Sequence, residues 1–216
     1  MVSRRLRLLT ILATLWLPSG ATAAAEPVRI LALGDSLTAG FGLKPAEGFT
    51  AQLQRALQER GVAAEVINGG VSGDTTAGGL ARLEWALGDR PDRVILALGA
   101  NDGLRALDPA VTRSNLAAIL DRLREKRLPV LLAGIYAPPN LGREYAERFD
   151  RIFPELATEY GLLFYPFFLD GVATRPHLNQ DDGLHPNAAG VAVIVEGIIP
   201  YVLRLLALPV ATPGGS

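Results

Sequence analysis

The feature that most constrains the fold is a repeated alternation of short apolar runs with longer amphipathic segments from residue 28 onward. Short apolar runs between turn signals fit buried strands, and an apolar residue at every third or fourth position fits a helix packed on one side. Strands that alternate with helices form a parallel sheet with helices on both faces. The sequence therefore predicts an α/β fold, with strands at 28–33, 64–67, 93–98, 130–135 and 162–165 and helices near 49–60, 76–87, 110–126, 143–160 and 187–206.

The last of these helices, at 187–206, is apolar on most of its sides. Glu196 and Arg204 interrupt this apolar surface, and charges within a membrane span are costly. We therefore interpret it as a packing helix of the core, interrupted at Pro200 because proline lacks the N–H that a helix needs. No linker divides the chain, so residues 26–208 are predicted to form a single domain, followed by a flexible tail at 209–216.

Residues 1–25 have the pattern of an export signal. Three arginines fall within the first seven residues, residues 8–17 are mostly apolar, and residues 21–25 are small. This order is typical of a secretory signal peptide, and the apolar run is too short for a comfortable membrane span. We therefore expect a periplasmic or secreted protein with no stable membrane insertion after cleavage; the alternative is an anchor that is not removed.

Composition excludes several classes of function. Without the three arginines of the signal peptide, the chain has 18 basic and 22 acidic residues, a net charge of about −4. This balance argues against nucleic acid or an anionic membrane surface as the main partner. The sequence has no cysteine, which excludes thiol nucleophiles and cysteine-based metal sites. Histidine chemistry must use His177 or His185, and His177, outside any motif, is interpreted as a solvent-facing loop residue.

Chemically distinctive residues gather in the loops that follow four of the predicted strands. In an open parallel sheet, ligands bind beyond the carboxyl ends of the strands. We therefore expect these loops to form one site. They are Gly34-Asp35-Ser36 after the first strand, residues 68–76 after the second, residues 98–103 after the third and residues 181–186 after the fifth.

Ser36 is predicted to be the nucleophile of a hydrolase, because an apolar strand that stops at Gly-Asp-Ser presents a hydroxyl at the edge of the sheet. Asp182 and His185 are three residues apart, so one helical turn would place both side chains on the same side. The carboxylate would then accept the Nδ1–H of the imidazole while Nε2 faces the serine. Asp181 is the competing carboxylate, and the plain alternative is a helix start with a capping acid.

Acyl transfer also needs hydrogen-bond donors for a developing oxyanion. The candidates are the backbone N–H groups of Ser36 and Gly73 and the side-chain amide of Asn101. Glycine at position 73 is expected because a side chain there would block the approach of the substrate. Taken singly, each of the three has a plain structural explanation as a turn, a loop hinge or a helix cap.

The alternative nucleophile is Ser72. Apart from the signal peptide and the C-terminal tail, the only other serine is Ser114, which lies inside a predicted helix. The residue two positions after Ser36 is Thr38, so the Gly-x-Ser-x-Gly elbow of ordinary α/β-hydrolases is absent.

Taken together, these loops resemble the SGNH (GDSL) hydrolase family, and in particular its bacterial periplasmic branch of thioesterases, lysophospholipases and arylesterases. The family's four blocks appear in order at residues 34–37, in the loop of Gly73, and at residues 99–102 and 182–185. The resemblance implies a three-layer α/β/α sandwich with a flavodoxin-like, five-stranded parallel sheet and no metal or organic cofactor. The site residues that it implies are Ser36 as nucleophile, His185 as general base and acid, Asp182 as orienting acid, and Ser36, Gly73 and Asn101 as the oxyanion hole.

The predicted activity is hydrolysis of small-molecule or lipid acyl esters through an acyl-enzyme. Carbohydrate O-acetyl esterases share the same segments and form one alternative; a non-catalytic periplasmic ligand-binding protein is another. The acyl pocket is expected near residues 104–107 and 135–145. The second segment contains Pro138-Pro139-Asn140 and is either a shaped loop over the cleft or only a strand-to-helix connection.

Overall fold

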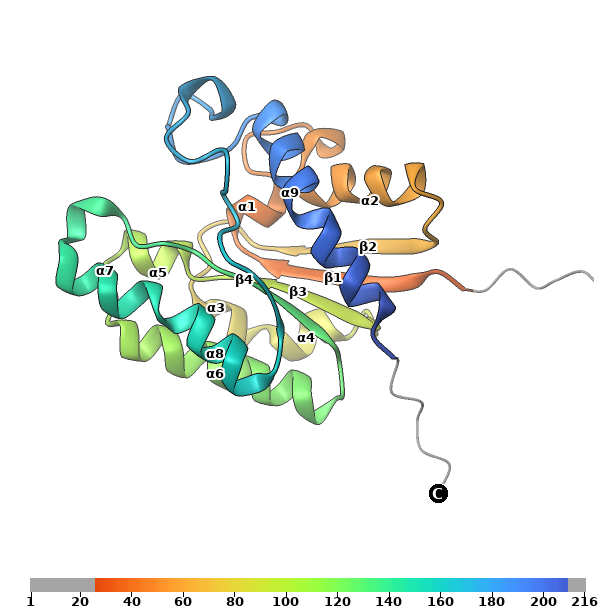
Figure 1. The fold of residues 1–216 in the computed structure, drawn as a ribbon, viewed down its shortest axis with the longest axis horizontal. Coiled ribbons are helices and arrows are strands. Elements are labelled where there is room, and N and C mark those ends of the chain that lie inside the picture. Colours follow the sequence, from red (N-terminus) through yellow and green to blue (C-terminus); the bar gives the residue numbers. More distant parts are fainter. Residues whose placement is uncertain (1–25, 210–216) are drawn as a thin grey trace, which may run out of the picture.

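The computed structural model describes residues 26–209. The predicted signal peptide lies outside these residues, as does the predicted tail apart from Pro209. Five parallel strands form one sheet in the order β2-β1-β3-β4-β5, with helices on either side of it (Figure 1). This is the strand order of flavodoxin-like folds, so the predicted architecture is confirmed. The strands are β1 (Val28–Gly34), β2 (Ala64–Gly70), β3 (Arg93–Ala97), β4 (Val130–Ala133) and β5 (Leu163–Tyr165).

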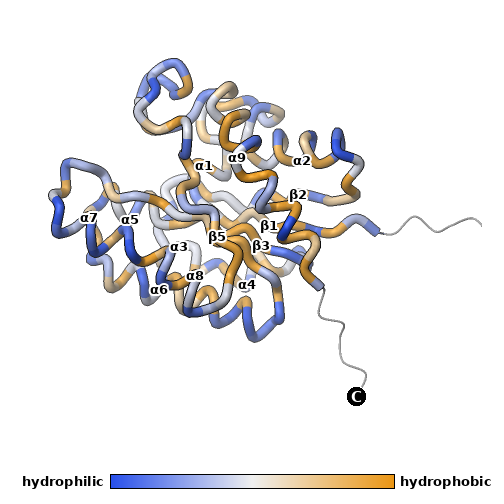
Figure 2. The backbone as a smooth tube through the Cα atoms, viewed as in Figure 1, coloured by the Kyte–Doolittle hydropathy of each residue, from blue (hydrophilic) through white to orange (hydrophobic). Residues whose placement is uncertain are grey.

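Two layers of helices enclose the sheet. Helices α2 and α9 pack against each other and cover one face, and α3, α4, α6 and α8 cover the other. Apolar residues concentrate in the central strands, whereas the outer turns of the helices are polar (Figure 2). The helices are α1 (Ser36–Ala39), α2 (Phe49–Glu59), α3 (Thr76–Ala81), α4 (Leu83–Leu87), α5 (Ala100–Leu104), α6 (Pro109–Glu125), α7 (Arg143–Asp150), α8 (Ile152–Tyr160) and α9 (Ala188–Ala207), with short 3₁₀ turns at Pro45–Glu47, Pro139–Leu141 and Pro176–Leu178.

The core lies on both sides of the central strands. Leu33 of β1, Ile95 of β3 and Leu132 of β4 are completely buried, as expected for strands covered by helices on both faces. Between the sheet and the α2–α9 layer, the rings of Phe49 and Phe168 meet edge to face with 5.0 Å between their centroids. The continuous apolar runs of the sequence are therefore explained by burial on both faces.

Two helices that were predicted as continuous are each divided. The helix predicted at 76–87 breaks at Arg82, whose backbone (φ −101°, ψ 5°) ends α3 and starts α4. The helix predicted at 143–160 breaks after Asp150. Pro154 has no N–H to donate to the carbonyl of Asp150, so the hydrogen-bond ladder stops there and α8 starts as a new helix.

Helix α9 differs from the prediction because it continues through Pro200 without interruption. By length and composition α9 could span a membrane, but it packs on α2, β4 and β5, and an ion pair of 3.2 Å joins Glu196 to Arg60 of the α2 end. At its C-terminal end, the buried guanidinium of Arg93 donates to the carbonyl of Leu205 over 3.1 Å. These contacts agree with the predicted packing helix.

Candidate active site

Ser36 is the first residue of α1, two residues after β1 ends. Asp35 caps this short helix, because its Oδ1 accepts the N–H of Leu37 over 3.0 Å. A Cβ at Gly34 would lie 2.0 Å from Oγ1 of Thr38, so only glycine allows the strand to turn this tightly into the helix. The turn places the hydroxyl of Ser36 at the carboxyl edge of the sheet, as predicted.

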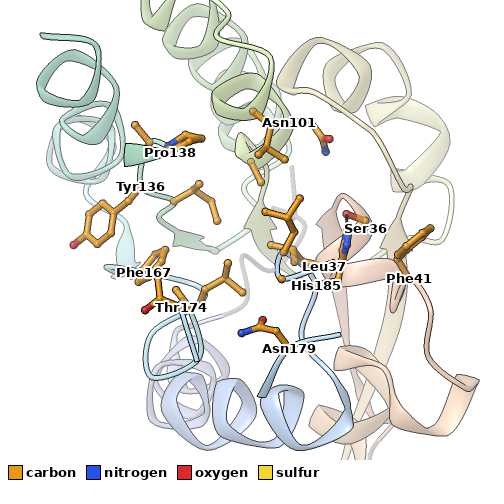
Figure 3. A pocket seen from close by; sticks show the side chains of 18 of the residues that line it. Ser36, Leu37, Phe41, Asn101, Tyr136, Pro138, Phe167, Thr174, Asn179 and His185 are labelled. Atoms are coloured by element: carbon orange, nitrogen blue, oxygen red, sulfur yellow. Dashed lines mark hydrogen bonds between the residues drawn. The ribbon is translucent and has the colours of Figure 1, made fainter. Parts of the chain in front are cut away.

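The hydroxyl of Ser36 lies against an imidazole that is itself held by a carboxylate. His185 Nε2 is 2.8 Å from Ser36 Oγ, and Figure 3 shows the two side chains next to each other. On the other side of the ring, His185 Nδ1 is 2.6 Å from Asp182 Oδ2. With its proton on Nδ1, the imidazole donates to Asp182 and accepts from the serine hydroxyl. The structure thus brings together the three residues that the sequence predicted as a triad.

Asp182 and His185 are brought together by a non-helical turn, and not by the helical turn that was predicted. Oδ1 of Asp182 accepts the backbone N–H groups of Leu184 and His185, each over 2.9 Å, and Gly183 has a φ of +69° that favours glycine. One oxygen of the carboxylate therefore folds the turn while the other holds the imidazole. Asp181, the competing carboxylate, is exposed and makes no hydrogen bond to the imidazole.

These contacts also set the charge of Asp182. The backbone N–H of His185, together with the imidazole and the N–H of Leu184, lowers the pKa of Asp182 to about 2 and outweighs the opposing effect of partial burial. The carboxylate stays ionised at neutral pH, which is the state that fixes the imidazole tautomer.

The loop that carries His185 is joined by hydrogen bonds to the loop after α1, a contact that was not predicted. Gln180 donates from Nε2 to the carbonyls of Phe41 (2.8 Å) and Pro186 (3.0 Å), and its backbone N–H donates to the carbonyl of His185 (2.8 Å). The ring of Phe41 packs on the imidazole with 4.6 Å between centroids. The only signal in the sequence was the position of Gln180 beside the two aspartates.

Two residues that line the cleft have backbone N–H groups without an acceptor in the described part of the protein. Among residues 26–209, neither the N–H of Ser36 nor that of Gly73 donates to another protein atom, and both residues line the cleft. Glycine at position 73 has a conformational reason, and the expected reason, access for the substrate, stays a prediction. A Cβ there would meet only Nη2 of Arg105, at 3.8 Å, whereas the φ of +85° is one that side chains rarely adopt.

Asn101 lies in the first turn of α5, on the same edge of the sheet. Its Nδ2 donates one N–H to the carbonyl of Asp74 over 2.9 Å, which leaves the second N–H of the amide available. The next residue, Asp102, is fully buried and accepts the backbone N–H of Thr76 (2.8 Å) and the hydroxyl of Thr112 (3.2 Å). These bonds anchor α5 to α3 and α6, and so fix the position of the Asn101 amide.

Asp35, which directly precedes the nucleophile in the chain, has an unusual environment. Its side chain is 1% exposed, and Oδ2 has no hydrogen-bond partner among the residues that the structure describes. Burial raises the pKa of Asp35 to about 7, although the N–H of Leu37 and the nearby His185 act in the opposite direction. The carboxyl group is therefore largely neutral below pH 7 and about half ionised near pH 7.

The remaining candidates lie apart from the triad. Ser72 lines the cleft from an exposed loop but makes no hydrogen bond to His185. His177 is exposed in the 3₁₀ turn Pro176–Leu178, as predicted. The structure thus places Ser36, and not Ser72, within reach of an imidazole.

An apolar pocket of about 490 Å³ leads away from Ser36. Its far end is formed by Tyr136 and Phe167, whose rings are 4.6 Å apart, and Figure 3 shows this pair across the pocket from Ser36. The expected segments contribute, but the side formed by residues 167–174 was missed because it carries no motif. The apolar and small lining residues are Leu37, Phe41, Ala100, Leu104, Ile135, Tyr136, Ala137, Pro138, Pro139, Phe167, Leu169, Ala173, Thr174 and Leu184.

Comparisons with known proteins agree with this geometry. The model of the GDSL-like Lipase/Acylhydrolase family matches residues 32–193, a range that contains all the loops of the site. The chain belongs to this family. The chain is therefore an SGNH-type ester hydrolase, and the fold and family expected from its sequence are confirmed.

Individual members of the GDSL family are similar over most of their length. Esterase TesA of Pseudomonas aeruginosa is 40% identical over 186 residues, which cover 86% of this chain and 92% of the relative. Thioesterase 1/protease 1/lysophospholipase L1 of Escherichia coli is 40% identical over 165 residues, covering 76% and 78%. The crystal structure of AlinE4, an SGNH-hydrolase family esterase, has 47% identity and a TM-score of 0.72, covering 87% of this chain and all of that one.

Proposed function

We propose that this GDSL-family enzyme cleaves acyl esters through a covalent acyl-enzyme on Ser36. The observation that carries the proposal is the unbroken series Ser36 Oγ–His185 Nε2 (2.8 Å) and His185 Nδ1–Asp182 Oδ2 (2.6 Å). A serine hydroxyl becomes a nucleophile when a neighbouring base takes its proton, and a base is effective when a third group fixes its orientation.

In the first half of the reaction, Oγ of Ser36 attacks the acyl carbon while Nε2 of His185 takes the hydroxyl proton. Asp182 remains ionised and stabilises the imidazolium that forms. The carbonyl oxygen becomes an oxyanion, which the N–H groups of Ser36 and Gly73 and the free N–H of the Asn101 amide stabilise. His185 then returns its proton to the leaving alcohol or thiol as the carbon–oxygen or carbon–sulfur bond breaks.

In the second half, a water molecule attacks the acyl-enzyme along the same route. His185 takes a proton from the water, the oxyanion hole stabilises the second tetrahedral intermediate, and the proton returns to Ser36 Oγ as the carboxylic acid leaves. No step in this route needs a metal ion or an organic cofactor.

The pocket supports an acyl group longer than acetyl as the preferred substrate. Apart from Thr174 and Asn179, its lining away from the catalytic residues is apolar, and an acetyl group on Ser36 would leave most of the 490 Å³ unfilled. Burial of each further methylene in such a pocket is worth about 0.8 kcal/mol. We therefore place aryl esters, acyl thioesters and lysophospholipids ahead of acetylated carbohydrates as substrates.

The substitution Ser36→Ala tests the nucleophile, with Ser72→Ala as the matched control. We expect Ser36→Ala to lose at least about 10⁴-fold in kcat with an unchanged far-ultraviolet spectrum, and Ser72→Ala to keep nearly normal turnover. The opposite result would move the nucleophile to Ser72. A phosphonate ester should label the wild type once per chain at Ser36, and failure to label would favour a non-catalytic binding protein.

A panel of substrates tests the acyl preference. Initial rates over aryl esters of increasing acyl length, beside acyl-CoA, lysophospholipid and acetylated sugar, should rise beyond acetate. A maximum at acetylated sugar would identify a carbohydrate O-acetyl esterase instead.

We also propose that the enzyme is exported, so that it acts in the periplasm or outside the cell. The support is the order of basic, apolar and small residues in 1–25. Expression of the full chain in a bacterium, followed by fractionation and N-terminal sequencing, should find a shortened chain outside the cytoplasm. A full-length chain in the membrane fraction would indicate an anchor.

A further inference from the structure

Arg82 joins two loops of the active site without reaching the cleft itself. It stands at the break between α3 and α4, and its side chain is only 16% exposed. Its Nε lies 2.5 Å from Oδ2 of Asp74, and its Nη2 donates to the carbonyl of Gly34 over 2.8 Å. Gly34 is the last residue of β1, and Asp74 belongs to the loop after β2, so a single guanidinium connects both.

Each acceptor of Arg82 is close in the chain to a proposed oxyanion donor. Gly34 precedes Ser36 by two residues, and Asp74 directly follows Gly73. The carbonyl of Asp74 also accepts the Asn101 amide over 2.9 Å. The ion pair between Arg82 and Asp74 is therefore linked to all three donors.

This ion pair differs from the others in the described part of the chain. Arg82 and Asp74 are 16% and 17% exposed, whereas the Arg113–Glu159 pair between α6 and α8 is 40% and 51% exposed. Exposed ion pairs contribute little to stability, whereas a partly buried pair with good geometry holds its two side chains in place. Helix α3 leaves space for this pair, since a Cβ at Gly78 would lie 2.6 Å from Oδ1 of Asp74.

We propose that Arg82 is a positioning residue that sets the spacing of the oxyanion hole, an inference that rests on the proposed function. The planar guanidinium holds the carbonyl of Gly34 and the carboxylate of Asp74 in one fixed relation, which fixes the loop of Gly73 relative to Ser36. A lysine has one nitrogen and cannot reproduce this double contact. Arg82 acts through the positions of the donors and touches no reacting atom.

A positioning role has a specific kinetic signature. The oxyanion exists only in the transition state and the tetrahedral intermediates, so donors that are out of place lower kcat and leave KM nearly unchanged. Misplacement by about 1 Å can cost about 10²-fold in rate. We expect Arg82→Ala to lower kcat by about 10- to 100-fold and to change KM by less than about threefold.

The experiment compares Arg82→Ala, Arg82→Lys and Asp74→Asn with Arg113→Ala, which removes an exposed ion pair. For each variant, kcat and KM are measured on a short aryl ester, together with the rate of labelling by a phosphonate. Both kcat and the labelling rate should fall in the three variants of the Arg82–Asp74 pair and stay unchanged in Arg113→Ala. Guanidinium ion, well below the concentrations that unfold proteins, should restore part of kcat in Arg82→Ala but not in Arg113→Ala, and sodium at the same ionic strength should not.

Two results would overturn the inference. One is a kcat for Arg82→Ala within about threefold of that of Arg113→Ala; the other is a lower kcat that comes with an equal rise in KM and no recovery with guanidinium. If Arg82→Ala does not fold, Asp74→Asn, which keeps the size of the side chain, gives the same test. The proposed function is tested separately, because a wild type that is labelled at Ser36 upholds it whatever Arg82 does.

Discussion

The catalytic end of the cleft and its apolar end are built from different contacts. At the catalytic end, Ser36, His185 and Asp182 are joined through hydrogen bonds of 2.6–2.8 Å between particular atoms. At the apolar end, Tyr136 and Phe167 meet through their rings, and neither side chain makes a hydrogen bond within residues 26–209. The catalytic end therefore requires a particular side chain at each position, whereas the apolar end requires only apolar side chains of suitable volume.

This difference determines how strongly a substitution at each end of the cleft changes the activity or the substrate preference. Replacement of a donor or an acceptor removes the whole hydrogen bond, so single substitutions at the catalytic end should lower kcat by large factors. The free energy of an apolar contact changes in proportion to the area buried, so single substitutions at the apolar end should change substrate preference by small factors. The predictions below test this contrast, first at the catalytic end and then at the apolar end.

The largest effect is expected for Asp182→Asn. Asparagine offers an N–H where Nδ1–H of His185 needs an acceptor, so the imidazole would favour the wrong tautomer, and kcat should fall about 10⁴-fold. Steady-state kinetics on an aryl ester measure this loss. Asp181→Asn is the control and should behave like the wild type; if Asp181→Asn were the inactive variant instead, the acid would be assigned to the wrong residue.

A smaller loss is expected for Asn101→Ala. It removes one of three proposed oxyanion donors, which should lower kcat by about 10²–10³-fold with little change in KM. Asn140→Ala, at an exposed asparagine of the Pro139–Leu141 turn, is the control. A loss below about threefold would remove Asn101 from the oxyanion hole.

At the apolar end, Tyr136→Ala should change the choice of substrate and not the chemistry. Removal of the ring opens the far end of the pocket, so kcat/KM for long acyl chains relative to short ones should rise about tenfold, while hydrolysis of a short ester stays near normal. Trp85→Ala, at a ring that is 77% exposed on α4, is the control. An unchanged profile over acyl length would show that Tyr136 does not form the end of the pocket.

The smallest effect concerns stability near the nucleophile. The folded-state pKa of Asp35 is about 7, above its usual 3.8, so the folded state keeps a proton that the unfolded chain releases. The stability that this proton provides is fully present below about pH 4 and is lost as the pH rises through about 7. The variant Asp35→Asn is neutral at every pH.

We therefore expect the Tm of Asp35→Asn, relative to that of the wild type, to rise as the pH increases from about 4 to about 8. Thermal unfolding followed by circular dichroism measures the difference, with Asp181→Asn as the control. Parallel curves for wild type and Asp35→Asn would mean that the carboxyl is ionised in the folded state.

The contrast between the two ends also explains which features the sequence predicts. The strands and the loops of Ser36, Gly73, Asn101 and His185 follow from apolar runs and from polar residues at fixed spacing, whereas the flavodoxin-like sheet was predicted only from the family resemblance. The side of the pocket at residues 167–174 could not be predicted, because apolar residues that line a pocket have the same pattern as those of the core. The interpretation of 135–145 as a shaped loop is supported by Pro138 and Pro139, which line the pocket.

The errors in secondary structure have local causes. Arg82 breaks a helix where its side chain contacts Asp74, in the preceding loop, and Gly34, which is 48 residues away in the sequence. Pro154 breaks another because it withdraws one hydrogen bond, whereas Pro200 is accommodated within a helix that is packed along its length. Helical periodicity alone cannot distinguish these cases, because the outcome depends on the surroundings of each residue.

The turn at residues 182–185 bears on which loops of this enzyme can change in length. The turn lies between Asn179 and Pro186, which form an antiparallel bridge, and its own backbone N–H groups hold the carboxylate against the imidazole. Residues inserted before Asn179 would lengthen one side of the pocket and leave the acid and base together, whereas a single residue inserted between Asp182 and His185 would separate them. An insertion before Asn179 can therefore change the substrate range, whereas an insertion within the turn at residues 182–185 would remove activity.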